Sequence, residues 1–254
     1  MAWDFRQEII IFVSCTTFNL VNMNLKYLGL FFSVLLIGFT SCKNDDDGNN
    51  LLPQEEQNQV DDATILKFLN EHYFNEVGKI TKFRDDVSSD DAMPSLMSNA
   101  ERANAGYWFV KRPGHLAEGR SVVNPDNDSI LIQYELLYYN ARKNGDSVNY
   151  SEPVNFSSTI NTTGYPIWDP SFYHHRNSTN DNRAEWYEME GVQDGLKHFQ
   201  ATGRSALDLP AVDFQGVIVV PSRLVFGRDR NTFGFGPDTS VILNFELYQV
   251  IDRN

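Results

Sequence analysis

A long strand-like run followed by a tight turn constrains the fold of this chain more than any other feature. Residues 129–140 read Ser-Ile-Leu-Ile-Gln-Tyr-Glu-Leu-Leu-Tyr-Tyr-Asn, a run rich in the β-branched and aromatic side chains that strands favour. Asn144-Gly145 comes shortly after it, and Asn-Gly is the strongest short-range signal for a β-hairpin. A return strand is therefore expected over residues 147–154, and the sheet is expected to be antiparallel.

Other segments add strands and one short helix. Strands are predicted over residues 106–112, 211–220 and 240–251. Between them, Val192, Leu196 and Phe199 recur at the i, i+4, i+7 spacing of an amphipathic helix over residues 191–199. The pattern predicts an α+β domain over residues 105–254, with an antiparallel sheet around one short helix.

A small helical segment is expected ahead of this domain, over residues 61–104. Asp61-Asp62 are predicted to open the helix, because acidic side chains favour the positive end of the helix dipole. Apolar residues then recur at helical spacing as far as Phe74, and Gly78 is the expected end of the helix.

The N-terminus has the features of a targeting segment. An apolar run over residues 27–39 follows Lys26, and it matches the length of a signal-peptide core rather than the roughly 20 residues of a membrane-spanning helix. The run leads into Phe39-Thr40-Ser41-Cys42, which resembles a bacterial lipobox, although Phe39 stands where Leu is usual. The resemblance implies that residues 1–41 are a removed signal peptide and that Cys42 is acylated.

Translation is expected to start at Met23, because Asp4 and Glu8 stand where a signal peptide carries positive charge. The acidic run after Cys42 is similar to the export signals of Bacteroidetes surface lipoproteins, and it reads equally well as a solvated tether. Residues 42–60 are predicted to be a flexible linker. The resemblance implies attachment to the lipid membrane through Cys42, at the outer membrane of a cell envelope, on its periplasmic face or at the cell surface. The alternatives are a transmembrane anchor and a secretory signal with an incidental cysteine.

The composition excludes several classes of function. A formal net charge of −13 argues against nucleic-acid binding, which needs a basic surface. The chain has only two cysteines, Cys15 and Cys42, so neither a disulfide framework nor a zinc cluster is expected. We expect no metal, no cofactor and a monomer.

The order of motifs from residue 105 to residue 252 resembles that of FKBP-type peptidyl-prolyl isomerases. The matching pieces are Tyr139, Asn144-Gly145, Glu190–Leu196, Val220–Gly227 and Val241–Leu247. The resemblance implies a curved antiparallel sheet wrapped on the short helix. It also implies peptidyl-prolyl cis-trans isomerase activity on proline-containing polypeptide segments, in the folding of envelope or secreted proteins.

This reaction breaks no bond, so it requires no nucleophile, metal or cofactor. The barrier of about 18–20 kcal/mol arises from the resonance of the peptide bond. A dry, apolar pocket penalises the planar amide more than the twisted one, and a few placed donors then stabilise the twisted carbonyl.

The resemblance assigns the pocket to particular residues of this chain. Tyr139 and Phe226 take the catalytic positions, and the substrate-binding positions fall on Val148, Asn149, Met189, Val192 and Leu243. Val192 stands where the family has a Trp floor, and Phe226 replaces a Tyr that donates a hydrogen bond. Trp168 and Trp186 are candidates to fill the floor.

Two alternatives to the isomerase stay open at this point. The first is a catalytically weak or inactive module that binds proline-containing segments of an envelope partner, which the residues at 192 and 226 favour. The second is a glycan-binding surface lipoprotein, for which the aromatic-rich stretch 155–186 is the support.

Overall fold

The computed structural model describes most of the chain from Leu51 onward, namely residues 51–115, 117–160, 162, 164–175, 186–205, 212–228 and 234–253. The expected signal peptide, Cys42 and the acidic run after it lie outside the described residues. Within the described residues, no helix is long and apolar enough to cross a lipid bilayer.

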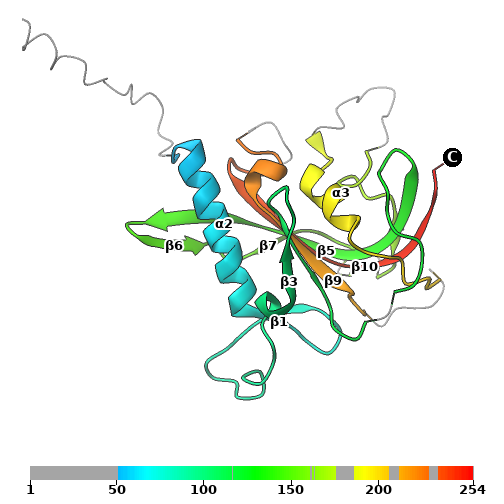
Figure 1. The fold of residues 1–254 in the computed structure, drawn as a ribbon, viewed down its shortest axis with the longest axis horizontal. Coiled ribbons are helices and arrows are strands. Elements are labelled where there is room, and N and C mark those ends of the chain that lie inside the picture. Colours follow the sequence, from blue (N-terminus) through cyan, green and yellow to red (C-terminus); the bar gives the residue numbers. More distant parts are fainter. Residues whose placement is uncertain are drawn as a thin grey trace, which may run out of the picture. The chain divides into compact units, whose positions relative to one another are not determined.

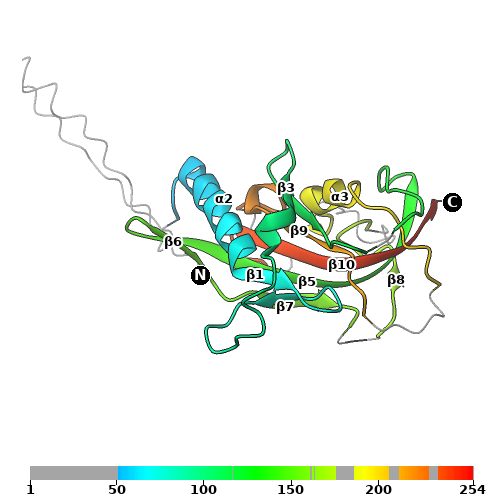
Figure 2. The same ribbon diagram turned by 60° about the horizontal axis from the view of Figure 1, so that its bottom comes forward.

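Two long strands, β5 (Asp128–Asn144) and β10 (Thr239–Asp252), pair along their length at the centre of an eight-stranded sheet. The sheet continues from β10 through β9 (Gly216–Val220) and β4 (Trp108–Lys111) to β3 (Ala100–Arg102). On its other edge, β5 pairs with β8 (Ile167–Trp168), β7 (Val154–Ser158) and β6 (Ser147–Tyr150). All these pairs are antiparallel, and both long strands bend along their course (Figures 1 and 2).

The predicted hairpin is confirmed, with a correction to its return strand. Gly145 lies in the turn with a φ of 59°, a conformation that Gly adopts without strain. The return strand expected over residues 147–154 ends at Tyr150, and β7 starts only at Val154. Pro153 separates the two, and its missing N–H cannot take part in a strand ladder.

The short helix α3 (Glu190–Leu196) packs closely on one face of the sheet. A Cβ atom at Gly195 would lie 2.6 Å from Ile218 Cγ2, and one at Gly191 would lie 2.3 Å from Val220 Cγ1. The spacing of these two glycines therefore lets the helix touch the strands. The core on this face includes Ile218, Val220, Val241, Leu243 and Phe245.

The long helix α2 (Gln54–Glu71) covers the opposite face. Because side chains alternate along a strand, Val217, Val219 and Ile242 point away from α3, and they pack with Ile65 and Phe68 of α2. The two helices are well separated in Figure 1, where α2 is blue to cyan and α3 is yellow.

Helix α2 corrects the prediction for this part of the chain. It begins at Gln54 rather than at Asp61, so residues 54–60 are helical and not a flexible linker. Asp61 is fully buried within the helix, where its Oδ2 accepts hydrogen bonds from Ser222 N at 3.0 Å and Ser222 Oγ at 2.6 Å. The helix ends before Gly78, because strand β1 (His72–Phe74) pairs with β2 (Ile80–Lys82) across the turn that contains this glycine.

The helical segment expected over residues 61–104 is continuous in structure with the domain expected over residues 105–254. Residues from Leu51 onward form one compact unit, since β3 pairs with β4 across that boundary. A 3-10 turn, η1 (Leu96–Asn99), leads into β3, and a second, η3 (Ser222–Leu224), follows β9. The α+β class is confirmed, with the antiparallel sheet around short α3 and a helix ahead of them.

Candidate functional site

An aromatic cavity of about 130 Å³ lies on the α3 side of the sheet. It is bounded by β5, by β7, by the segment that leads into α3, and by the segments that follow β9 and precede β10. Its lining is mostly apolar and aromatic, and consists of Tyr134, Leu136, Phe156, Ser157, Ser171, Phe172, Trp186, Tyr187, Met189, Phe226 and Phe235.

Aromatic packing fixes the walls of this cavity. Phe235 lies at the centre of one cluster, with its ring centroid 4.3 Å from that of Phe156, and 5.5 Å from those of Phe226 and Tyr138. On another side, Tyr134 and Phe172 meet edge to face at 4.9 Å. Edge and tilted contacts are the geometry that aromatic pairs prefer, so these walls are well packed.

The cavity also contains a pair of hydroxyl groups. Tyr134 Oη lies 2.9 Å from Ser157 Oγ, and Tyr134 is only 4% exposed. Burial raises the pKa of the Tyr134 phenol, although the hydrogen bond with Ser157 opposes this effect, so the group carries its proton at neutral pH. Only one of the two hydroxyls donates in their mutual bond. The other keeps a proton that can be donated to a bound carbonyl.

Four of the residues carried over from the family resemblance lie on the α3 side. Met189 and Phe226 line the cavity. Val192 and Leu243 are fully buried in the core on the same face and are not among the residues that line the cavity. Trp186 is part of the lining, whereas Trp168 lies on β8 with 43% of its surface exposed.

The other three expected pocket residues lie elsewhere, and their placement is a correction. Tyr139 is fully buried on the opposite face, stacked on Phe68 of α2 with 6.3 Å between ring centroids. Asn149 Oδ1 accepts a hydrogen bond of 2.5 Å from Lys67 Nζ, also on α2, and Val148 is its neighbour in β6. For Tyr139 the physical reason is strand alternation, because Tyr138, one residue earlier, is the tyrosine that faces the aromatic cluster.

Sequence reasoning missed Tyr134, Phe156, Ser157 and Phe235 as cavity residues. Tyr134 could have been found, because it shares the face of Leu136 and Tyr138 in a period-two pattern. Phe156 and Ser157 lie in a stretch whose sequence is typical of a loop, and Phe235 lies between β9 and β10. Neither segment has a periodic pattern of apolar residues that would have predicted its place in the cavity. No group of three or more His, Cys, Asp or Glu side chains that could hold a metal occurs in the part of the chain that the structure describes.

Comparison with known proteins identifies no family. No protein-family model matches the sequence, and no curated protein matches it. Solved structures that resemble it include FkpA from Escherichia coli, with 16% identity over 61% of this chain and 53% of that chain, at a TM-score of 0.36. A peptidyl-prolyl cis-trans isomerase from Pseudomonas syringae is 12% identical over 80% of this chain and 98% of that chain, at a TM-score of 0.39.

A third similar structure is a DUF4827 family protein from Parabacteroides distasonis, which is 12% identical over 78% of this chain and 98% of that chain, at a TM-score of 0.36. The alignment with FkpA spans about half the length of that protein. Similarities of this size do not assign the chain to a family.

Proposed function

We propose that the aromatic cavity binds proline-containing polypeptide segments and accelerates the cis-trans isomerisation of their X-Pro bonds. The observation that carries this proposal is a small, aromatic-walled cavity that holds a paired Tyr134–Ser157 hydroxyl group. Its volume of about 130 Å³ is smaller than that of pockets for drug-sized ligands and suits a single ring.

The cavity offers what the reaction requires. Apolar walls exclude water, and this destabilises the planar amide more than the twisted one, whose dipole is smaller. The hydroxyl pair supplies a donor for the carbonyl of the twisted state, a role that Phe226 cannot fill. The order of FKBP-like motifs along the chain supports the same function.

An isomerisation assay on a proline-containing peptide tests the proposal. We expect the full chain to accelerate isomerisation above the uncatalysed rate, and we expect Tyr134→Phe to lower kcat/KM by roughly 2- to 12-fold. That range corresponds to the loss of about 0.5–1.5 kcal/mol for one hydrogen bond. Tyr139→Phe is the matched control, because it removes a hydroxyl from the opposite face of the sheet. A full chain that leaves the rate at the uncatalysed value rules out catalysis.

A second candidate is a module that binds proline segments without catalysis. Phe226 favours it, because this wall residue lacks the phenol that would donate a hydrogen bond to the twisted state. This candidate predicts saturable binding of the proline peptide, observed as quenching of tryptophan fluorescence, together with an unchanged isomerisation rate. The packing of α3 on the sheet counts against the glycan-binding alternative, which assumed an unrelated β fold.

We further propose that the protein is anchored in a bacterial cell envelope through an acylated Cys42, on the basis of the lipobox-like Phe39–Cys42 segment. Metabolic labelling with a palmitate analogue tests the anchor. The label is expected on the wild-type chain and is expected to be lost in Cys42→Ala, whereas Cys15→Ala is expected to keep it. Label on Cys42→Ala would contradict the anchor.

A further inference from the structure

Phe226, in the wall of the aromatic cavity, lies on a short loop over residues 222–227, which we call the Phe226 loop. The carbonyl oxygen of Ser222 accepts hydrogen bonds from Val225 N at 3.0 Å and from Gly227 N at 2.9 Å, on either side of Phe226. The Phe226 ring is half-buried and lines the cavity. Both backbone bonds end on one residue, so a displacement of Ser222 would carry Phe226 with it.

Ser222 is fixed by a buried carboxyl group of α2. Asp61 Oδ2 accepts hydrogen bonds from Ser222 N at 3.0 Å and from Ser222 Oγ at 2.6 Å. Asp61 Oδ1 accepts a third, of 2.8 Å, from Gln57 Nε2, one helical turn earlier. Asp61 and Ser222 are both fully buried. A displacement of Ser222 would leave two buried donors without their acceptor, which costs free energy.

Two further contacts join the same stretch to α2 and to the residue pair ahead of it. Arg223 Nη2 donates to Asp62 Oδ1 at 2.7 Å, and Arg228 Nη2 donates to the carbonyl oxygen of Leu52. The Arg223–Asp62 pair is partly exposed, so water weakens it. Of these three contacts, that of Ser222 alone is fully buried on both sides. It is therefore expected to hold the loop most firmly.

The apolar residues of α2 have a different task from Asp61. Ile65 and Phe68 pack with Val217 and Val219 of β9, in the core on the α2 face. They cover the sheet, whereas Asp61 reaches the turn that follows β9. Stability of the sheet and placement of the Phe226 loop can therefore be altered separately.

We propose that Asp61 is a positioning residue for the aromatic cavity. By fixing Ser222, it holds the Phe226 ring in the wall against which a proline ring packs, although Asp61 itself touches no substrate. This inference rests on the proposed function of the cavity. A wall that is fixed before binding spares the free energy of ordering it when the peptide arrives.

NMR of the full chain with labelled phenylalanine reports where the Phe226 ring lies, whether or not the protein is a catalyst. Asp61→Ala is expected to shift the ring resonances of Phe226 and to weaken its nuclear Overhauser contact with Phe235, because Ser222 has lost its acceptor. Ser222→Ala removes one of the two donors and is expected to cause the same changes to a smaller extent.

Two variants separate positioning from stability. Asp61→Asn keeps an oxygen for the Ser222 donors, and the Gln57 amide can turn to accept from the new amide group, so the Phe226 signals are expected to stay at their wild-type positions. Ile65→Ala is the matched control, because it removes a fully buried side chain of the same helix. It is expected to lower the free energy of unfolding at least as much as Asp61→Ala, yet to leave the Phe226 signals in place.

Kinetics with a proline-containing peptide measure the consequence for the cavity. Phe226 contributes apolar contact to the planar and the twisted peptide alike, so its displacement weakens binding of both. Asp61→Ala is expected to raise KM by roughly 2- to 12-fold, the range for the loss of one aromatic contact. Its kcat is expected to stay near the wild-type value, because the Tyr134–Ser157 hydroxyl pair lies outside the Phe226 loop.

The proposal is overturned if Asp61→Ala folds with unchanged Phe226 signals, or if Ile65→Ala shifts these signals as much. If Asp61→Ala does not fold, Ser222→Ala takes its place, and unchanged Phe226 signals in that variant overturn the proposal. A wild-type chain that neither binds nor isomerises the peptide rules out the proposed function, while the NMR comparison still decides whether Asp61 positions Phe226.

Discussion

The two faces of the central sheet differ in how completely a helix covers them. Helix α2 has 18 residues, and its face forms a closed core in which Ile65, Phe68 and Tyr139 are buried. Helix α3 has seven residues and spans about 10 Å, whereas the 17-residue strand β5 spans roughly 56 Å. Loops must cover the rest of the α3 face.

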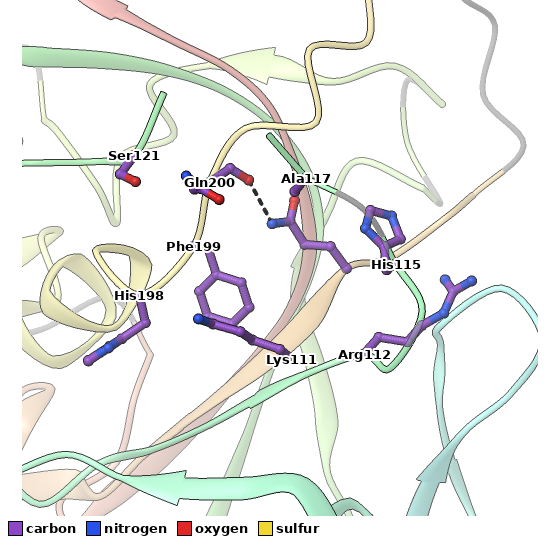
Figure 3. A pocket seen from close by; sticks show the side chains of 9 residues that line it. Lys111, Arg112, His115, Ala117, Ser121, His198, Phe199 and Gln200 are labelled. Atoms are coloured by element: carbon purple, nitrogen blue, oxygen red, sulfur yellow. Dashed lines mark hydrogen bonds between the residues drawn. The ribbon is translucent and has the colours of Figure 1, made fainter. Parts of the chain in front are cut away.

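Two cavities lie beside the segments that precede and follow α3. The aromatic cavity includes Met189, which precedes the helix. The other cavity, of about 320 Å³, includes His198 and Gln200, which follow the helix (Figure 3). A short helix thus leaves space at each of its ends. The other face also has a cavity, of about 210 Å³, but it lies beside β1 and η1 and no residue of α2 lines it. We therefore expect substitutions in the apolar core beneath α2 to change stability and substitutions around the aromatic cavity to change binding.

The largest expected effect is on the α2 face. Phe68 is 1% exposed, and Phe68→Ala is expected to lower the free energy of unfolding by about 3–5 kcal/mol, through lost apolar burial and the cavity left behind. Urea denaturation followed by circular dichroism measures it. Leu66→Ala on the exposed side of the same helix is the control, with an expected change within about 0.5 kcal/mol. A loss below about 1 kcal/mol for Phe68→Ala would mean that α2 does not stabilise the sheet.

The buried carboxyl of the same helix is expected to have the next largest effect. Asp61→Ala leaves the Ser222 donors and the Gln57 amide without their acceptor, which is expected to cost about 1–3 kcal/mol of unfolding free energy. Asp62→Ala removes a partly exposed carboxylate that pairs with Arg102 and Arg223, and is expected to cost less than about 1 kcal/mol. Equal losses in the same denaturation assay would contradict the special role of the buried carboxyl.

Local sequence signals predicted much of the sheet and α3. The Asn144-Gly145 turn, the glycine spacing of α3 and the alternation in β10 each depend on neighbouring residues, and each is found in the structure. The start of α2 was not predictable in this way. Asp61 has the pattern of a helix start, but it is buried because Ser222, 161 residues later, satisfies its carboxyl group.

The candidate site was predictable only in part, because it depends on strand register. Pairing with β10 places Tyr139 opposite Ser240 and Tyr138 opposite Val241, and this decides which tyrosine faces α3. One position of difference moves a side chain to the other face of the sheet. Met189 and Phe226 were found because they lie in motifs with a fixed order, whereas Phe235 comes from a segment without any periodic pattern.

A tyrosine at position 226 on the α3 face is expected to increase isomerase activity. Phe226→Tyr adds a phenol to the wall of the aromatic cavity and is expected to raise kcat/KM for proline-peptide isomerisation by roughly 2- to 12-fold, equivalent to about 0.5–1.5 kcal/mol for one hydrogen bond. Its unfolding free energy is expected to stay within about 0.5 kcal/mol of the wild-type value. An unchanged rate would indicate that the Tyr134–Ser157 pair already supplies the donor.

The free energy of unfolding is also expected to depend weakly on pH, with a larger contribution from a histidine on the α2 face than from one on the α3 face. Burial lowers the pKa of His72 beneath α2, and burial also lowers the pKa of His198 near α3. A histidine whose pKa is lowered in the folded state contributes stability above its unfolded pKa of about 6.5, and this contribution is lost as the pH falls toward the folded value. The free energy of unfolding is therefore expected to decrease below about pH 6.5.

His72 is the more deeply buried of the two histidines, at 5% exposure, so His72→Gln is expected to flatten this decrease more than His198→Gln. Denaturation curves between pH 5 and pH 8 measure both slopes, and a larger effect of His198→Gln would place the acid-sensitive contact on the α3 face.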